Sequence, residues 1–574
     1  MSHRPKVDNA AIPERSKQNL SCNWTGSADF GRLVPIHWEE LVEGDHVITC
    51  KPRIEMQMLA FASPTFGKID LYCHYFLVPI RQLQKTFYDI WSQTGVYKNS
   101  QLSYFTPKSL ASLYQQTQTD AMKRGLFKHW TSLGLNPFFT LGATNVTDNS
   151  TPISYFPFAA YNKIWWDFYR DPEVLRDESE SSYLFTDTIQ GTPDDQNFAN
   201  AYLYPHVRSI KNCWISDLFA QQGQTPSSES TPISPFPLSS RFPYQDPYTG
   251  AGVVVGAGDE HIHPYAVDSA TEEVYTLRNS AQDVRLIESL TRLAERLSLS
   301  GKRQIEALYA RYGVKPKWSE MNLCRYVGGA KSTVLVDSII SNADTAAADG
   351  VGSPLGAKGG TGYCAMNDLN IEVSVDEPSI LMGIVSIMPH IHFVQGLSKK
   401  WQRKELVDMF QPSLQYVGNI GVAKREIAMK YRSNQTYDST KDGQVFAYSD
   451  PYYEYKMGLD TLAGDFMTYH NVTLPTDPQA KKDVLYMQSM EQYIDFPFDR
   501  LFNLNNMLID GDQYNKIFAY LGGSIFDDVD DHFHLCVDKE VVIDRPMAGF
   551  AIPSLETTKD PHEKTVALGH DTIL

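Results

Sequence analysis

Acidic and imidazole side chains are concentrated in the stretch FDDVDDHFH, residues 526–534, which holds four aspartates and two histidines. Carboxylates are the ligands that calcium prefers, and imidazoles suit zinc. The acids form two adjacent pairs with no glycine between them, unlike an EF-type calcium loop, and the rest of the chain nominates no further zinc ligand. Two interpretations stay open, a solvated turn before a final strand and a cation site. The weak candidate ligands are Asp527, Asp528, Asp530 and Asp531.

Two clusters of basic residues each include an aromatic side chain, in KKWQRKE (399–405) and AKREIAMKYR (423–432). Cations beside aromatic rings are expected where a protein meets the phosphates and unstacked bases of a single-stranded nucleic acid. The alternative is a solvated face with ion pairs inside the chain. The candidate residues facing nucleic acid are Lys399, Lys400, Trp401, Arg403, Lys404, Lys424 and Arg425.

No stretch carries a recognisable catalytic signature. GGAKST (328–333) lacks the glycine that precedes lysine in a phosphate-binding loop, so a tight turn is expected there. The glycine-rich residues 350–362 are expected to form a flexible loop. No HExxH, GxSxG or nucleophilic cysteine pattern occurs. An enzyme is therefore the weaker hypothesis, and no cofactor beyond a structural cation is expected.

Composition favours a protein with large contact surfaces made in a reducing compartment. The 574 residues include 28 Phe, 32 Tyr and 9 Trp, with 32 Pro and 36 Gly, which is typical of a loop-rich β protein. The net charge of −17 argues against a surface that is basic throughout. Seven cysteines without a CxxC pair predict free thiols. Without a signal-like or membrane-spanning apolar run, the chain is expected to be soluble and cytoplasmic when made.

Strands are predicted near both ends of the chain, after a polar arm that covers residues 1–23. Apolar and polar residues alternate over 46–58, where Pro52 favours an edge or bulged strand. Residues 68–78 continue the pattern and lead into a short helix from Arg81. Further strands are predicted over 369–376, 380–393 and 533–546. Together they indicate one antiparallel sandwich.

The middle of the chain is predicted to be an elaborated connection within that sandwich. Residues 100–276 are expected to be mostly irregular, with short helices near 161–170 and 214–222, and 226–276 to form a surface-exposed insertion. Apolar residues at helical spacing predict a helix pair over 277–313, which ends near Gly313.

The order of eight blocks along the chain resembles the major capsid proteins of the Microviridae, and most of all their gokushovirus-like members. The resemblance runs from about residue 30 to about 555 and includes CWISDLFAQQG, RQIEALYARYGV, GIVSIMPHIHFVQG, DPYYEYKMGLDTLAGDF and DRPMAGFAIPSL in the same order. It implies a viral eight-stranded antiparallel jelly roll with long, partly helical insertions between the strands. Residues 1–574 would then be one capsid protomer.

The same resemblance implies a structural role and a set of partners. About sixty copies would form a small icosahedral shell around circular single-stranded DNA, assembled in the bacterial cytoplasm and present in the virion. A small basic DNA-binding protein, a minor or pilot capsid protein and a host surface receptor are the other implied partners. The insertion at 226–276 sits where such proteins raise a projection at the threefold axes. A cation held by the four aspartates would be shared with a neighbouring subunit.

The acidic composition then requires an uneven distribution of charge. About sixty copies at −17 would place on the order of 1,000 negative charges around a polyanion. We therefore expect acidic residues on the outside of the shell and the two basic clusters on the inside, with cations or a small basic protein meeting the remaining charge. The alternative from another class is a β-sandwich protein that binds or processes glycans, consistent with the many aromatic residues.

Overall fold

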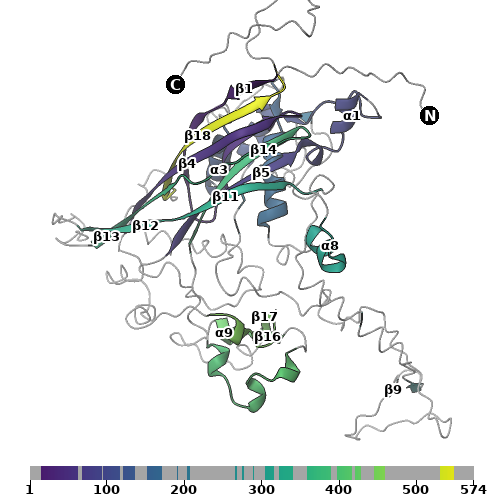
Figure 1. Ribbon diagram of the computed structural model, residues 1–574, viewed down its shortest axis with the longest axis vertical. Helices are drawn as coiled ribbons and strands as arrows, with labels where there is room; N and C mark the ends of the chain where they lie inside the picture. Colours follow the sequence, from purple (N-terminus) through teal and green to yellow (C-terminus); the bar gives the residue numbers. More distant parts are fainter. Residues whose placement is uncertain are drawn as a thin grey trace, which may run out of the picture.

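The computed structural model shows a two-sheet β sandwich with a layer of helices on one side (Figure 1). The residues that it describes are 15–61, 68–93, 95–116, 120–135, 151–170, 190–191, 203, 205–206, 208, 265–267, 274–276, 289, 304–315, 322–340, 358–389, 397–415, 420–427, 445–458 and 531–547.

The first sheet is built around the last strand of the chain. One edge of β18 pairs with β4. The other edge pairs with β1 over one part of its length and with β2 over another part. Beyond β4 the sheet continues through β13 to β12. The short β14 also pairs with β4. All pairs are antiparallel. The strands are β1 (Ser16–Asn19), β2 (Cys22–Ala28), β4 (His46–Phe61), β12 (Leu335–Ile340), β13 (Lys358–Met366), β14 (Val373–Ser374) and β18 (Phe533–Arg545).

The second sheet has the order β11-β5-β15-β3, and its pairs are also antiparallel. Its strands are β3 (Val34–Leu41), β5 (Ile69–Pro79), β11 (Arg325–Thr333) and β15 (Ser379–Pro389). Across the two sheets the pairing is nested. β2 pairs with β18, β3 with β15, β4 with β13 and β5 with β11, so that early strands meet late strands in reverse order.

The main core lies between the two sheets, and alternation along the strands produces it. In β18 the residues Phe533, Leu535 and Val537 are buried while the residues between them are exposed. Successive side chains of a strand point to opposite faces, so this period-two pattern turns one face of β18 to the core and the other to solvent. The same cluster takes in Ile54 of β4 and Leu71 of β5. The strands predicted at 46–58, 68–78, 380–393 and 533–546 are confirmed over their described residues, but only Val373–Ser374 of the predicted 369–376 forms a strand, and Val47 takes the buried place expected for Ile48.

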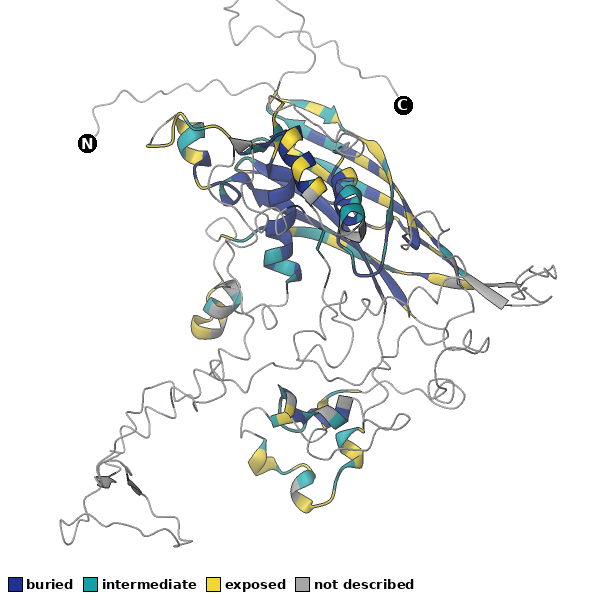
Figure 2. Ribbon diagram, turned by 180° about the vertical axis from the view of Figure 1, so that it is seen from behind, coloured by how far each residue is buried: buried dark blue, intermediate teal, exposed yellow. Residues whose placement is uncertain are grey.

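Helices cover the outer face of the second sheet, which explains why β5 and β15 are buried on both faces (Figure 2). A second core cluster joins Phe76 of β5 and Ile384 of β15 to Trp130 and Tyr161 of the helices. The helical elements are α1 (Phe87–Ser92), α2 (Pro107–Gln116), α3 (Asp120–Ser132), α5 (Phe156–Ile164) and its π-helical continuation η2 (Trp165–Tyr169), with the turn η1 (Ile80–Gln82) before them. The predicted helix near 161–170 is confirmed, whereas α2 and α3 were not predicted.

A bulge in β3 places a charged side chain in the sandwich. The consecutive residues Gly383 and Ile384 of β15 pair with His37 and Pro35 of β3. Ile36 is therefore an extra residue of β3 without a partner in β15. Its carbonyl accepts a hydrogen bond of 3.1 Å from Nζ of the buried Lys539, on the facing sheet. Lys539 therefore satisfies a backbone group that the ladder leaves unpaired.

A glycine in β15 makes room for a buried tyrosine, which yields a prediction about stability. A Cβ added at Gly383 would lie 2.5 Å from Cζ of Tyr75, whose side chain is fully buried. We expect Gly383→Ala to lower the free energy of unfolding by about 1–3 kcal/mol through overpacking. Urea unfolding measures this effect. The matched control is Gly328→Ala in β11, where the nearest side-chain atom would be at 3.6 Å, and an equal loss in both variants would contradict the explanation.

Four sequence expectations need correction. GGAKST is not a turn but part of β11, which pairs with β5, and Lys358 to Gly362 belong to β13 and not to a loop. The polar arm is shorter than expected, because β1 and β2 already pair with β18. The strand at 46–58 is central, since β18 and β13 flank it. In the pairing with β18 its bulge lies at Ile48 and not at Pro52. Along its other edge, Pro52 lies between the residues that pair with β14 and those that pair with β13.

The remaining elements lie in the long connections. They are β6 (Tyr104–Phe105), β7 (Ile153–Ser154), β8 (Gln190–Gly191), β9 (Tyr265–Val267), β10 (Val274–Thr276), α8 (Gln304–Tyr312), β16 (Ile420–Ala423), α9 (Lys424–Ile427), β17 (Val445–Ser449) and α11 (Tyr453–Lys456), with turns η6 (Lys399–Trp401), η7 (Leu406–Asp408) and η8 (Pro412–Leu414). α8 forms the second part of the predicted helix pair. Its first part, the helix at 214–222 and most of the insertion at 226–276 lie outside the described residues.

Candidate functional site

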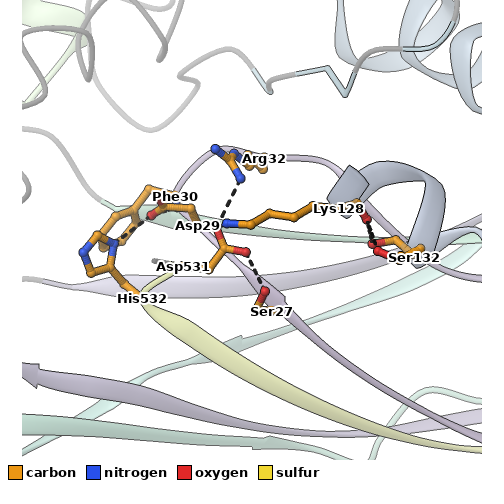
Figure 3. Close-up of polar contacts among 9 residues, drawn as sticks. Ser27, Asp29, Phe30, Arg32, Lys128, Ser132, Asp531 and His532 are labelled. Atoms are coloured by element: carbon orange, nitrogen blue, oxygen red, sulfur yellow. Dashed lines mark hydrogen bonds and ion pairs between the residues drawn. The ribbon is translucent and has the colours of Figure 1, made fainter. Parts of the chain in front are cut away.

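Of the acidic stretch 526–534 the structure describes residues 531–534. Asp531 belongs to a buried ion-pair cluster at the start of β18 (Figure 3). Oδ1 of Asp531 accepts hydrogen bonds from Nζ of Lys128 at 2.7 Å and from Nη1 of Arg32 at 3.2 Å. Its Oδ2 accepts from the hydroxyl of Ser27 at 2.6 Å. Only 3% of the Asp531 side chain is exposed. The cluster therefore fastens the last strand to α3 and to the segment that follows β2.

The cations hold Asp531 in its ionised form. Burial alone would raise the pKa of this carboxyl group, but Lys128 and Arg32, together with the Ser27 hydrogen bond, lower it below its usual value. Both oxygens already have donors, so the charge of the carboxylate is compensated within the chain. The expectation of a solvated turn is thus wrong for Asp531. The other candidate ligands, Asp527, Asp528 and Asp530, lie outside the described residues.

The two histidines of the stretch, His532 and His534, lie in different surroundings. His532 is buried, and its Nδ1 lies 3.2 Å from Oδ1 of Asp29, whereas His534 is exposed on the solvent face of β18. Among the described residues, no group of three or more His, Cys, Asp or Glu side chains could hold a metal ion.

The two basic clusters meet in one small unit, which we call the basic unit and define as residues 397–415, 420–427 and 445–458 (green in Figure 1). β16 pairs with β17, and the backbone N–H of Leu397 donates to the carbonyl of Arg425 at 2.8 Å. This hydrogen bond joins the residues just before the first cluster to the second cluster. The sequence separates the clusters by about twenty residues, and the fold brings them into contact.

A buried carboxylate lies at the centre of the basic unit. Glu426 accepts hydrogen bonds from the hydroxyl of Tyr453 and, at 3.1 Å, from the backbone N–H of Ala423. Burial raises the pKa of Glu426. Nζ of Lys399 lies over the ring of Tyr453, 5.6 Å from its centroid. Lys399 therefore packs against the interior of the unit, and the residue that follows it, Lys400, is exposed.

Aromatic side chains lie on the surface of the basic unit beside the cations. Trp401 is 82% exposed. The guanidinium of Arg403 lies 4.7 Å from the ring centroid of Tyr455, which itself contacts Phe410 and Tyr452 edge-on at 6.3 Å each. This arrangement presents positive charge and flat rings together, the combination that single-stranded nucleic acids require.

The structure thus sorts the seven predicted nucleic-acid-facing residues. Three of them are exposed: Lys400, Trp401 and Lys404. Three are half-buried: Lys399, Arg403 and Arg425. The seventh is Lys424, whose side chain is not among those that the structure describes. The sequence reading missed Phe410, Tyr452 and Tyr455. The run DPYYEYK contains two of these rings, but it is about fifty residues from Arg403, and nothing in it gave a sign of that contact.

Comparison with known proteins places the chain among viral coat proteins. A profile of the family described as Capsid protein (F protein) matches residues 6–507. The chain belongs to this capsid protein family. Over 490 residues the capsid protein is 22% identical to Capsid protein VP1 of Bdellovibrio phage phiMH2K, covering 79% of this chain and 82% of that protein. It is also 25% identical over 223 residues to Capsid protein VP1 of Chlamydia phage 1, covering 38% of this chain and 35% of that protein.

Family membership confirms the expected resemblance and decides the class of function. The chain is the major capsid protein of a Microviridae-type phage, a structural and non-enzymatic component of the virion that associates with copies of itself. It also decides against the alternative of a glycan-processing enzyme. No helix in the described part of the capsid protein is long and apolar enough to cross a membrane.

Proposed function

We propose that the capsid protein is the wall subunit of a small icosahedral shell and that its two sheets form an eight-stranded viral jelly roll. The nested pairing of strands carries this proposal. Folding a long antiparallel hairpin over on itself pairs the first strand with the last and the second with the last but one, as in a jelly roll. The pairs β2–β18, β3–β15, β4–β13 and β5–β11 follow that order.

In this proposal residues 1–574 form one protomer, and about sixty protomers enclose circular single-stranded DNA. The sandwich supplies a rigid wall, and the long connections reach neighbouring subunits. The insertion at 226–276 forms the outer projection that meets the host receptor. A minor or pilot capsid protein joins the shell.

We place the basic unit on the inner face of the shell, where it holds the genome weakly and without sequence preference. Charge supports this placement. The described residues of the basic unit contain seven Lys or Arg and five Asp or Glu, a net charge of +2 (7 − 5), in a chain with a net charge of −17. Cations or a small basic protein neutralise the DNA charge that the unit does not meet.

Sedimentation and negative-stain microscopy of the purified full chain test the proposed assembly. We expect closed shells of uniform size, or capsomers that assemble into them. A protein that sediments as a monomer under all conditions, with no shells in the micrographs, would contradict the proposal.

A further inference from the structure

We infer that Trp401 and the stacked Arg403–Tyr455 pair of the basic unit form a stacking site for unpaired bases of single-stranded nucleic acid. This inference rests on the proposed function, which places the basic unit against the genome. It adds that the contact is made through base rings as well as through phosphates. The exposed lysines beside these rings would hold the phosphates.

The backbone around Trp401 is fixed although its side chain is exposed. In η6 the N–H of Trp401 donates to the carbonyl of Ser398 at 2.9 Å, and the hydroxyl of Ser398 accepts from the N–H of Lys400 at 3.3 Å. Nε2 of Gln402 donates to the carbonyl of Leu397 at 2.6 Å. The turn therefore holds the indole outward at 82% exposure, with no ring contact to any described residue of the basic unit. A large apolar ring held in solvent on an ordered turn is available for stacking.

The second platform is a cation fixed over a half-exposed ring. The guanidinium of Arg403 lies 4.7 Å from the centroid of Tyr455, which is 50% exposed. Within the described part of the chain, Nε and Nη2 of Arg403 have no hydrogen-bond partner, and no carboxylate lies within ion-pair distance. Arg403 is thus held by stacking rather than by an acid. Nε and Nη2 of Arg403 are buried, so the exposed half of the Tyr455 ring, with this cation behind it, is the surface on which a base can stack.

Four of the five carboxylates of the basic unit are engaged by donors or buried, and Glu405 is the exposed one; Asp450 accepts from Nζ of Lys456 at 3.3 Å. Asp408 accepts hydrogen bonds from the backbone N–H groups of Lys404 and Glu405, both at 2.8 Å, which lowers its pKa. Glu426 and Glu454 are buried. The exposed cations Lys400 and Lys404 flank the rings, so the surface complements a polyanion.

Fluorescence anisotropy with the purified full chain separates ring contacts from phosphate contacts. The probes are labelled (dT)20 and an abasic strand of the same length, each titrated at several salt concentrations. We expect the wild type to bind (dT)20 about 10-fold more tightly than the abasic strand, because stacked bases add affinity that phosphates cannot supply. Trp401→Ala and Tyr455→Ala should each remove most of this preference and leave the salt dependence unchanged, and Trp401→Phe should retain most of the preference.

The lysines and a distant tryptophan provide matched variants. Lys400→Ala and Lys404→Ala should weaken binding of both strands alike and lower the salt slope by about 0.7 each. Trp91→Ala, at an exposed tryptophan of α1, and Lys98→Ala, at an exposed lysine, are the controls. Neither should change the preference for (dT)20 or the salt slope. Equal wild-type affinity for the two strands would overturn the stacking site and leave the proposed interface standing. No salt-dependent binding of either strand would overturn both.

Discussion

Lowering the pH from 7.5 to 5 is expected to reduce the free energy of unfolding of the dissociated capsid protein by about 6 kcal/mol through His37, His129 and His206. Burial also lowers the pKa of His74, to about 4, and this histidine adds to the loss. Burial lowers the pKa of His37, His129 and His206 to about 3 each, with a further contribution from Lys539 at His37 and from His129 at His206. In the unfolded chain these imidazoles titrate near their ordinary value of 6.5.

The direction follows from which state binds more protons. Because the folded-state pKa values are depressed, the unfolded state gains protons first, as the pH falls below 6.5. Each histidine stabilises the fold fully above that pH, and its contribution declines as the pH falls towards 3. At pH 5 the loss is about 2 kcal/mol for each, and the sum is comparable with the total stability of a typical domain.

His129 provides the variant that isolates this effect. Both of its ring nitrogens are buried without a hydrogen-bond partner among the described residues, and its ring centroid lies 4.4 Å from that of Tyr161. His129→Phe keeps a flat ring and removes the titrating group, so its stability should fall by about 2 kcal/mol less than that of the wild type between pH 7.5 and 5. Urea unfolding at each pH measures the difference. A stability of the wild type that is constant over this range would contradict the expectation.

Removing Lys128 is expected to lower the free energy of unfolding by about 2–3 kcal/mol, because Asp531 then stays buried with only Arg32 to balance its charge. In Lys128→Met the stem of the side chain is retained and the 2.7 Å ion pair is lost. Urea unfolding at neutral pH measures the loss. Lys108→Met, at an exposed lysine of α2, is the matched control and should stay within about 0.5 kcal/mol of the wild type.

A double-mutant cycle tells whether the pair itself matters. Asp531→Asn removes the buried charge, so adding Lys128→Met to it should cost at least about 1 kcal/mol less than Lys128→Met alone. Strictly additive effects would show that Lys128 does not act through Asp531. The pKa of Asp531 is lowered in the fold, so its contribution is intact above the ordinary aspartate value of 3.8 and declines only below it. The cycle is therefore independent of the histidine effect between pH 5 and 7.5.

The strands with a buried face could be predicted because their side chains alternate. β5 and β18 carry long period-two sequence patterns, and the structure confirms both as strands, although burial alternates only in β18 because helices cover the outer face of β5. β11 could not be predicted, because RYVGGAKST is rich in glycine and largely exposed, and only pairing with β5 makes it a strand. α3 was missed because Gly125 interrupts it and because, among its described side chains, Leu126 and Trp130 are the only buried apolar ones.

The candidate sites depended on contacts between distant parts of the chain. The cluster at 399–405 indicated a surface for nucleic acid by composition alone, since cations and an aromatic ring are adjacent in sequence. The contact of Arg403 with Tyr455 crosses fifty residues and leaves no local pattern. Lys128 and Asp531 are 403 residues apart, so the sequence could not show that this aspartate is neutralised within the chain. Burial and partners decide its role, and both come from the fold.

A reconstruction of purified particles by electron cryomicroscopy tests the central proposal most directly. We expect an icosahedral shell whose wall is the two-sheet sandwich, with Lys400, Trp401 and Arg403 on the inner surface facing the genome. A shell with these residues on its outer surface would contradict the inward-facing nucleic-acid interface, and a particle without icosahedral symmetry would contradict the proposed assembly itself.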